Sequence, residues 1–206
     1  MTAELFFIYD SHCPWSYATT PLVNELQKHV PDMPIHLWHC AYFSDADSDN
    51  MISRQQIKQV KAMSTVNFSP KYLDKLETVK DSTLCANVMT WAANKIPEQA
   101  LNLLNSLQSA HFEGGNALNT EQALSHIVAD FKLSLPIKVY NNKKLTTDAA
   151  AQVHEVYALQ EIIETQAIPA LLLAIDNDLI LLDHSLYLQS PSELIDVIND
   201  KLATKA

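Results

Sequence analysis

The feature that most constrains the fold is an apolar run that leads into a cysteine followed by a proline. Leu5–Tyr9 is almost entirely apolar, as expected for a strand buried on both faces. Cys13 and Pro14 come a few residues later, and from Pro14 to about Val30 apolar side chains recur every four positions, which predicts a helix. Proline is favoured at the first helical position. The sequence therefore predicts a strand followed by a helix, with Cys13 at the helix N-cap.

This position makes Cys13 the candidate nucleophile. The unpaired N–H groups of the first helical turn and the helix dipole favour an anion, so we expect the pKa of the Cys13 thiol to lie below the free-cysteine value of about 8.5. Ser16 falls at the third helical position, where its hydroxyl can donate a hydrogen bond to a thiolate but cannot form a disulfide. The alternative is an ordinary buried cysteine beside a proline-initiated helix.

The neighbours of Cys13 carry two further expectations. His12, if protonated, would lower the pKa of the thiol further, and a solvated loop histidine is the open alternative. Trp15 and Tyr17 either line a substrate groove or pack against the core.

The chain continues with a second strand and a long helical segment. Pro31 and Pro34 end the first helix, and residues 35–40 follow as a strand. A strand, a helix and a strand in this order form a βαβ unit, whose two strands are parallel. Residues 50–165 carry helical patterns throughout.

Strands return near the C-terminus. Residues 168–175 form an apolar run that begins Ile168-Pro169, and residues 179–182 form a second run. The polar triplet 176–178 between them predicts a hairpin turn. Residues 190–193, Ser-Pro-Ser-Glu, have the pattern of a capping box and predict the start of a closing helix.

Composition excludes several classes of protein. The 206 residues carry a net charge of −10, and the longest basic cluster is Lys143-Lys144, so nucleic acid is not expected as a partner. The two glycines are adjacent, which excludes glycine-rich phosphate loops. We find no secretory signal and no run long enough to span a membrane. The three cysteines are too few for a disulfide framework, so we expect a cytoplasmic protein with reduced thiols.

The order β-α-β, helical block, β-β-α resembles the DsbA-like branch of the thioredoxin superfamily. Cys13-Pro14-Trp15 matches the start of the Cys-x-x-Cys motif of that family, and Ile168-Pro169 matches its cis-proline, which faces the active cysteine. Leu107–Phe112 with Gly115 resembles a helix end in cytoplasmic DsbA-like proteins.

This resemblance implies an α/β thioredoxin-like fold (βαβ–ββα) with a large all-helical insertion. The N-terminal βαβ part is expected at 1–45, the helical insertion at 46–165 and the C-terminal ββα part at 166–206.

The resemblance also implies an activity. Ser16 stands where the family has its second cysteine, so the chain is expected to act as a monothiol thiol-disulfide oxidoreductase or isomerase that forms a mixed disulfide through Cys13. Protein or small-molecule thiols and disulfides are the expected partners, with glutathione as a candidate co-substrate and no other cofactor. The expected catalytic residues are Cys13 and Ser16, and the expected substrate-binding residues are His12, Pro14, Trp15, Ile168 and Pro169. The oligomeric state stays open, a homodimer included.

A second resemblance leads to a different activity. Kappa-class glutathione transferases and 2-hydroxychromene-2-carboxylate isomerases share this fold and carry Ser-Pro-x-Ser or a similar motif at the same place. Pro14 and Ser16 fit that motif, whereas Cys13 does not. A glutathione-dependent transferase or isomerase is therefore the alternative enzyme, and a binding protein without turnover is a third reading.

The second predicted strand carries further residues that could bind a metal or react. His36, His39 and Cys40 lie close in sequence, but alternation along a strand puts His39 on the opposite face from the other two, so no metal site is expected. Cys40 is expected to stay reduced and to play no part in resolving a mixed disulfide.

Overall fold

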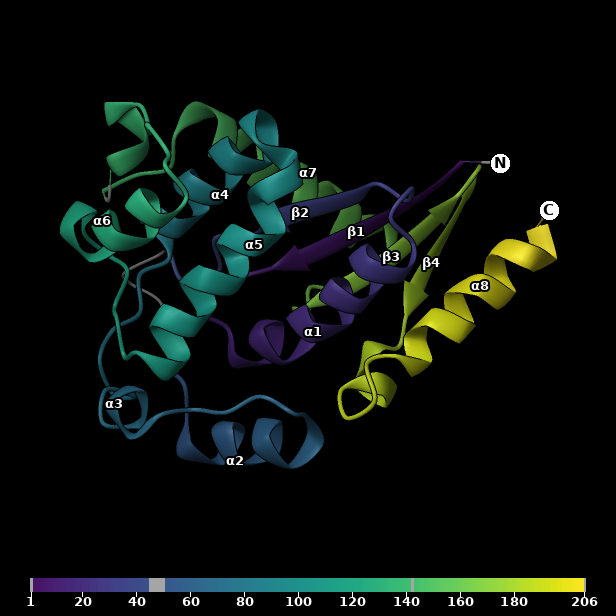
Figure 1. Ribbon diagram of the computed structural model, residues 1–206, viewed down its shortest axis with the longest axis horizontal. Coiled ribbons are helices and arrows are strands. Elements are labelled where there is room, and N and C mark those ends of the chain that lie inside the picture. The colour runs from purple at the N-terminus through teal and green to yellow at the C-terminus, as the bar shows by residue number, and fades with distance from the viewer. Residues whose placement is uncertain (1, 45–50, 142, 206) are drawn as a thin grey trace.

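The computed structural model describes residues 2–44, 51–141 and 143–205. A four-stranded mixed sheet in the order β2-β1-β3-β4 forms its centre (Figure 1). β1 pairs with β2 in parallel, whereas the pairs β1–β3 and β3–β4 are antiparallel. The strands are β1 (Ala3–Tyr9), β2 (Ile35–His39), β3 (Ala170–Ile175) and β4 (Asp178–Leu182). Both ends of the chain therefore contribute to one sheet, which confirms the expected α/β architecture.

Helices account for most of the rest of the described chain. α1 connects β1 to β2, a long run of helices connects β2 to β3, and α8 follows β4 (Figure 1). The α-helices are α1 (Pro14–His29), α2 (Arg54–Met63), α3 (Pro70–Leu73), α4 (Thr83–Lys95), α5 (Pro97–Gln108), α6 (Glu121–Asp130), α7 (Thr147–Ile162) and α8 (Glu193–Lys205). Short helices of other types are η1 (π, Ser109–Glu113), η2 (3-10, Ile137–Tyr140) and η3 (3-10, His184–Tyr187). The helical block expected between the strands is confirmed.

Alternation along the strands divides the core between the two faces of the sheet. Leu5, Phe7 and Tyr9 of β1 are buried in the larger cluster, which includes residues of α1 and α8. Ile8 lies in a smaller cluster with Val156 of α7 on the opposite face. β1 is therefore covered on both sides, as its continuous apolar sequence predicts.

Helix starts in the insertion follow local capping chemistry. The side chains of Ser53, Ser69, Thr120 and Thr146 each accept a hydrogen bond from a backbone N–H in the first turn of the following helix. These residues satisfy N–H groups that would otherwise lack a partner. The N-termini of α2, α3, α6 and α7 are therefore encoded locally in the sequence, whereas α4 and α5 lack a side-chain cap.

Several strand and helix boundaries differ from the expected ones. The closing helix α8 begins at Glu193, whereas the capping-box pattern at 190–193 puts the N-cap at Ser190, so that prediction was wrong for the helix start. β3 begins at Ala170 and not at Ile168, because Pro169 has no N–H for the ladder. β2 ends at His39, one residue before Cys40. The helix that begins at Pro97 changes at Ser109 into the wider π-helical turn η1.

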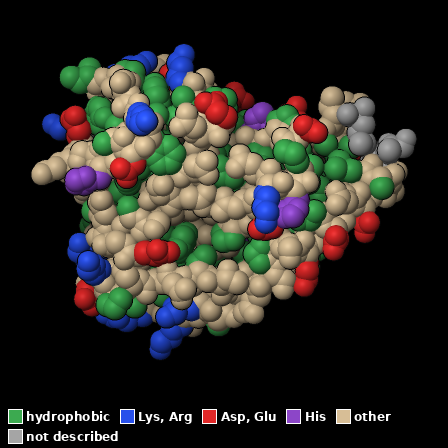
Figure 2. All heavy atoms as spheres, viewed as in Figure 1, with side chains coloured by type: hydrophobic (Ala, Val, Ile, Leu, Met, Phe, Trp, Pro, Cys, Tyr) green, Lys and Arg blue, Asp and Glu red, His purple; other side chains and the backbone are tan. Residues whose placement is uncertain are grey.

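None of the described helices combines the length and the apolar composition that a membrane span needs. The space-filling view shows acidic side chains in a row over α8 and basic side chains over α2 and α3 (Figure 2). Charge is therefore unevenly distributed over this face of an acidic protein.

Candidate functional site

Cys13 lies at the junction of β1 and α1, as the sequence predicts. It is the N-cap of α1, with φ −81° and ψ 121°, and Pro14 is the first helical residue. The N–H of Cys13 donates to the Asp10 carbonyl at 3.1 Å, and its own carbonyl accepts from Tyr17 at 3.0 Å. The turn therefore fixes the backbone of the cysteine at the carboxyl end of β1. Cys13 is only 5% exposed.

Burial reverses the expected acidity of Cys13. The pKa of the thiol is raised, because the cost of burying a thiolate exceeds the stabilisation by its neighbours. Those neighbours are the backbone N–H and hydroxyl of Ser16 and the backbone N–H of Trp15, which all lower the pKa through hydrogen bonds to the sulfur. The charge of Asp10 raises it further. The expectation of a lowered pKa was therefore wrong for this structure, although the predicted hydrogen-bond donors are in place.

Ser16 connects the sulfur to the end of β1. Its side chain is fully buried, and its oxygen accepts a hydrogen bond from the Asp10 N–H at 3.3 Å. The same hydroxyl hydrogen-bonds the sulfur of Cys13. A hydroxyl has one proton and two lone pairs, so Ser16 can accept from Asp10 while it donates to Cys13.

His12 is fully buried and does not face solvent. Its Nε2 lies 3.0 Å from the Ala117 carbonyl, and its Nδ1 lies 3.0 Å from the Ser11 hydroxyl. The carbonyl can only accept, so Nε2 carries a proton and Nδ1 is left to accept from Ser11. Burial lowers the pKa of His12, although Asp10 opposes this effect. His12 is therefore neutral at neutral pH, which corrects the expectation that its charge acidifies Cys13.

His39 extends this buried polar cluster on β2. The N–H groups of Ser11 and Ala41 lie 3.1 Å from its Nε2 and 3.0 Å from its Nδ1. Donors that face both ring nitrogens disfavour a doubly protonated ring. Burial lowers the pKa of His39 to about 4. The second histidine is thus also held neutral.

Asp10 was not singled out by the sequence analysis. Its fully buried carboxylate accepts from the His12 N–H at 2.8 Å, the Phe43 N–H at 3.2 Å and the Ser82 hydroxyl at 2.6 Å. These bonds connect the loop before Cys13 to the start of the helical insertion. The available signal was an acidic residue directly after a buried strand, three positions before the cysteine.

The peptide bond between Ile168 and Pro169 is cis, as predicted. In the antiparallel ladder Ile8 is paired with Ala170. Continuing this register by one residue puts Pro169 across from Tyr9, at the end of β1 that leads to Cys13. The cis-proline and the cysteine therefore belong to the same edge of the sheet.

The helical insertion supplies an aromatic cluster beside α1. The ring of Tyr17 stacks on Phe112 with centroids 4.5 Å apart and meets Phe68 edge-on at 5.8 Å. Tyr72 contacts Phe112 and His111 at 5.0 and 5.2 Å. Burial, and second the charge of Cys13, raise the pKa of Tyr72. Tyr72 is therefore a neighbour of the cysteine that comes from a segment without any recognisable motif.

The remaining cysteines differ in position: Cys85 is fully buried in the same core cluster as Cys13 and hydrogen-bonds Ser11. All three cysteines are free thiols. Cys40 packs with Ile8 in the cluster under α7, whereas Cys13 belongs to the cluster on the other face of the sheet. Among the described residues, no three His, Cys, Asp or Glu side chains are grouped so that they could hold a metal ion.

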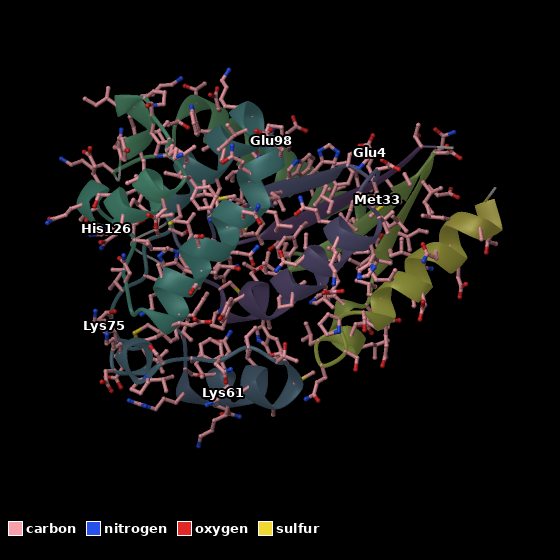
Figure 3. The ribbon with its side chains drawn as sticks, viewed as in Figure 1. Glu4, Met33, Lys61, Lys75, Glu98 and His126 are labelled. Atoms are coloured by element: carbon pink, nitrogen blue, oxygen red, sulfur yellow. The ribbon has the colours of Figure 1, made fainter. Side chains whose placement is uncertain are left out.

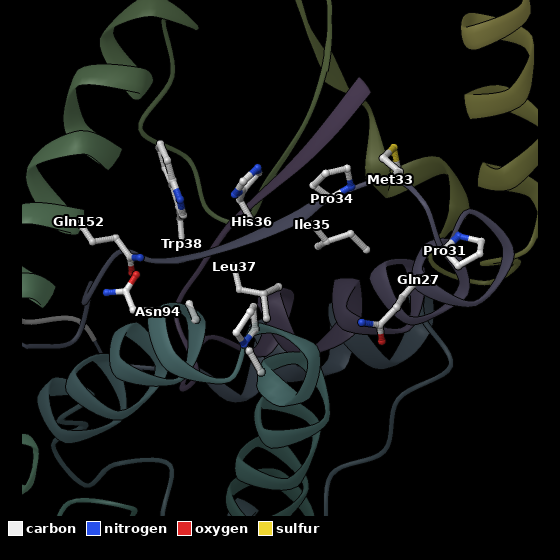
Figure 4. A pocket seen from close by; sticks show the side chains of 13 residues that line it. Gln27, Pro31, Met33, Pro34, Ile35, His36, Leu37, Trp38, Asn94 and Gln152 are labelled. Carbon is white, nitrogen blue, oxygen red and sulfur yellow. The ribbon is translucent and has the colours of Figure 1, made fainter. Parts of the chain in front are cut away.

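A groove of about 440 Å³ follows the outer edge of β2 (Figure 4). His36 and Trp38 of β2 line it together with Asn94 and Gln152 from neighbouring helices (Figure 4). Neither Cys13 nor the cis-proline is among its lining residues. The groove is therefore separate from the candidate site.

Comparison with family models and with curated proteins found no match. Comparison with solved structures found the cytosolic disulfide reductase DsbM from Pseudomonas aeruginosa, with a TM-score of 0.82, 18% identity and coverage of 98% of this chain and 99% of the other. The same protein with GSH matches with a TM-score of 0.80, 17% identity and coverage of 97% and 99%. A DsbA variant of Pseudomonas aeruginosa matches with a TM-score of 0.53, 10% identity and coverage of 99% and 87%. At these identities the likeness concerns the fold, and this chain has the DsbA-like thioredoxin fold with its helical insertion.

Proposed function

We propose that this protein is a monothiol thiol-disulfide oxidoreductase or isomerase that reacts through Cys13. The observation that carries the proposal is the group of donors around the sulfur: the N–H groups of Trp15 and Ser16 and the Ser16 hydroxyl all stabilise a negative charge on Cys13. The cis Ile168–Pro169 bond at the same edge of the sheet and the likeness to a disulfide reductase support it.

The proposed step is a thiol-disulfide exchange. Cys13 loses its proton to solvent, and the thiolate attacks one sulfur of a disulfide R–S–S–R. A bond forms between the Cys13 sulfur and that sulfur, the original S–S bond breaks, and the other half leaves as a thiolate. The products are a mixed disulfide on Cys13 and one free thiol, so one disulfide is consumed and one is formed.

Resolution of the mixed disulfide requires an external thiol. Ser16 has no sulfur, Cys40 packs on the other face of the sheet, and Cys85 is fully buried with its thiol hydrogen-bonded to Ser11. A second thiol, such as glutathione, attacks the mixed disulfide, restores the Cys13 thiolate and carries away the bound half as a disulfide. Glutathione suits this role, because DsbM, which shares the fold, was solved with GSH.

The proposed roles of the surrounding residues follow from their positions. Ser16 and the first turn of α1 stabilise the thiolate, and the backbone before Pro169 offers an extended edge to the substrate. Pro14 fixes the start of the helix, and Trp15 is half-buried beside the sulfur. We propose a cytoplasmic location, since the reaction needs reduced thiols and DsbM is described as cytosolic.

Intact-mass measurement after incubation with oxidised glutathione tests the proposal. The expected result is one glutathione adduct, which maps to Cys13, is absent from Cys13→Ser and is removed by reduced glutathione. Binding of glutathione without an adduct favours the transferase or isomerase alternative. If the protein neither binds glutathione nor forms an adduct with oxidised glutathione or any other small disulfide, the remaining alternative is a binding protein without catalytic activity.

A further inference from the structure

A small cavity lies beside the candidate site, between α3, η1 and the loops that follow them. It has about 30 Å³ of free volume, close to the space that one water molecule occupies in the liquid. Tyr72, Lys75, Lys80, His111 and Ala117 are among the residues that line it. The cavity can therefore accept the end of a ligand but not a whole ligand.

Two lysines bring positive charge to this cavity. Lys80 is only 9% exposed, and its ammonium donates to the Lys75 carbonyl at 2.6 Å and to the Thr78 hydroxyl at 3.2 Å. The ammonium of Lys75 donates to the Gly115 carbonyl at 2.9 Å. Each ammonium has three N–H donors, so both have donors left for a ligand.

These charges have no carboxylate partner in the described part of the chain. Lys75 and Lys80 form none of its salt bridges. Asp81 also lines the cavity, but its Oδ1 accepts from the Thr83 N–H at 2.9 Å. Burial first, and then the charge of Lys75, lower the pKa of Lys80, whose ammonium also lies 5.6 Å from the centre of the Tyr72 ring.

Burying a cation without a counter-charge is costly, and a small anion in the cavity would offset that cost. His111 lies at the same cavity. Its Nδ1–H donates to the Asn116 carbonyl at 2.7 Å, so its buried Nε2, which has no hydrogen-bond partner, can accept a hydrogen bond but cannot donate one to an anion. The lysines alone therefore supply the donors for the anion. In Figure 2 basic side chains gather near α3, and Figure 3 labels Lys75, which lies in the turn that follows this helix.

The cavity adjoins the residues around the sulfur. The Ala117 carbonyl accepts from Nε2 of His12, the residue before Cys13. The rings of His12 and His111 are 4.2 Å apart. Tyr72 lines the cavity and is also affected by the charge of Cys13. The cavity and the sulfur are therefore connected through His12 and Tyr72, and an extended tripeptide, about 10 Å long, is the size of ligand to test.

We propose that the cavity between Lys75 and Lys80 binds a carboxylate of a small thiol ligand of the glutathione type, whose sulfur exchanges at Cys13. This inference rests on the proposed function and adds the substrate class: a peptide thiol that carries a free carboxylate. Lysine suits this role, because its ammonium is a compact charge with three donors.

Calorimetric binding of S-methylglutathione tests the cavity separately from the redox chemistry, because this compound cannot form a disulfide. Lys80→Met is expected to raise the Kd by about tenfold or more, since a hydrogen bond to a charged group is lost. Lys75→Met is expected to act in the same direction and, at an exposed position, leaves the core intact. Lys61→Met is the control, since it removes the same charge from α2, where Figure 3 shows Lys61.

Ligand variants identify the recognised group. Two monoethyl esters of S-methylglutathione each lack one of its two carboxylate charges. For one of these esters the wild type and Lys75→Met are expected to have the same Kd, because the carboxylate that Lys75 binds is missing. Equal affinities of the wild type, Lys75→Met and Lys80→Met for S-methylglutathione overturn the carboxylate site, as does wild-type protein that does not bind it.

The neutral hydroxyethyl disulfide separates this outcome from a failure of the proposed function. It is expected to label Cys13 in the wild type and equally in the control variant Lys61→Met, because it has no carboxylate. A chain that reacts with this disulfide but binds S-methylglutathione independently of the lysines keeps its proposed function and loses the carboxylate site. A chain in which Cys13 reacts with no disulfide loses the proposed function.

Discussion

The hydroxyl of Ser16 hydrogen-bonds the sulfur of Cys13. Cys13 is the N-cap of α1, and Ser16 follows three residues later in the first turn of this helix. In this relationship the serine contributes a proton donor where a second cysteine would contribute a resolving thiol. The same oxygen accepts from the backbone of Asp10, which holds the hydroxyl in place. Ser16 therefore stabilises the thiolate and gives it no internal partner.

Removing this hydroxyl should make Cys13 less reactive. Ser16→Ala is expected to raise the pKa of Cys13 further and to slow its alkylation near neutral pH by roughly fivefold, the value of one hydrogen bond of about 1 kcal/mol. The rate of iodoacetamide labelling at Cys13, followed by mass spectrometry, measures this effect. Thr20→Ala is the matched control, because its hydroxyl bonds the Ser16 carbonyl and not the sulfur. Equal rates in Ser16→Ala and the wild type would contradict the role of Ser16.

Restoring a second thiol should create an internal disulfide. Positions 13 and 16 lie at the N-cap and in the first turn of α1, so Ser16→Cys is expected to crosslink to Cys13 under mild oxidation and to gain dithiol activity. Peptide mapping and an insulin-reduction assay measure the two results. Cys13→Ser/Ser16→Cys serves as the control. A variant that keeps two free thiols after oxidation speaks against this geometry.

The thiol of Cys13 should titrate above the free-cysteine value. Burial outweighs the donors of α1, so the inflection of alkylation rate against pH is expected above about 8.5. Reactivity therefore rises as the pH is increased through the ordinary range for cysteine. The measurement uses a Cys40→Ala/Cys85→Ala background, which removes the other two buried thiols. An inflection well below 8.5 would show that the donors outweigh burial.

Acid should destabilise the fold through its buried histidines. Burial lowers the pKa of His12, His39 and His111, with His39 at about 4. Below the unfolded value of about 6.5 the unfolded chain binds more protons than the native one, so stability is full above that pH and falls as pH decreases towards 4. His39 lowers the unfolding free energy by up to about 1.4 kcal/mol per pH unit in that window, and His12 and His111 act in the same direction.

Urea denaturation from pH 7 to 4.5 measures this slope. His39→Gln removes one of the titrating groups and is expected to give a shallower dependence, even where it is less stable at pH 7. An unchanged slope in this variant would mean that His39 is accessible to protons in the native state.

Cys13 and Cys40 should remain uncoupled. They pack on opposite faces of the sheet, so oxidation of the purified protein is expected to give no disulfide between them. Non-reducing peptide mapping checks this, with Ser16→Cys as a positive control for crosslinking. A Cys13–Cys40 peptide from the monomer would replace the monothiol mechanism with a dithiol one.

Local patterns in the sequence were enough to predict the order of strands and helices. Proline at position 14 and the apolar repeat behind it predict the start and the buried face of α1, because both depend on neighbours along the chain. The cis bond at Pro169 was predicted only through the resemblance to a family, and the structure confirms it.

The acidity of Cys13 depends on the tertiary structure. Helix N-terminal donors are local and were predicted, but the desolvation of the sulfur comes from side chains far away in sequence, and it is the larger effect. The same holds for His12, whose neutral state results from burial, since the hydrogen bond to the carbonyl of Ala117, 105 positions along the chain, raises its pKa. The cavity between Lys75 and Lys80 also depends on segments brought together by folding. The sequence by itself determined that a cysteine and a histidine stand at the start of α1. Their charge depends on burial, and burial is defined only by the packed fold.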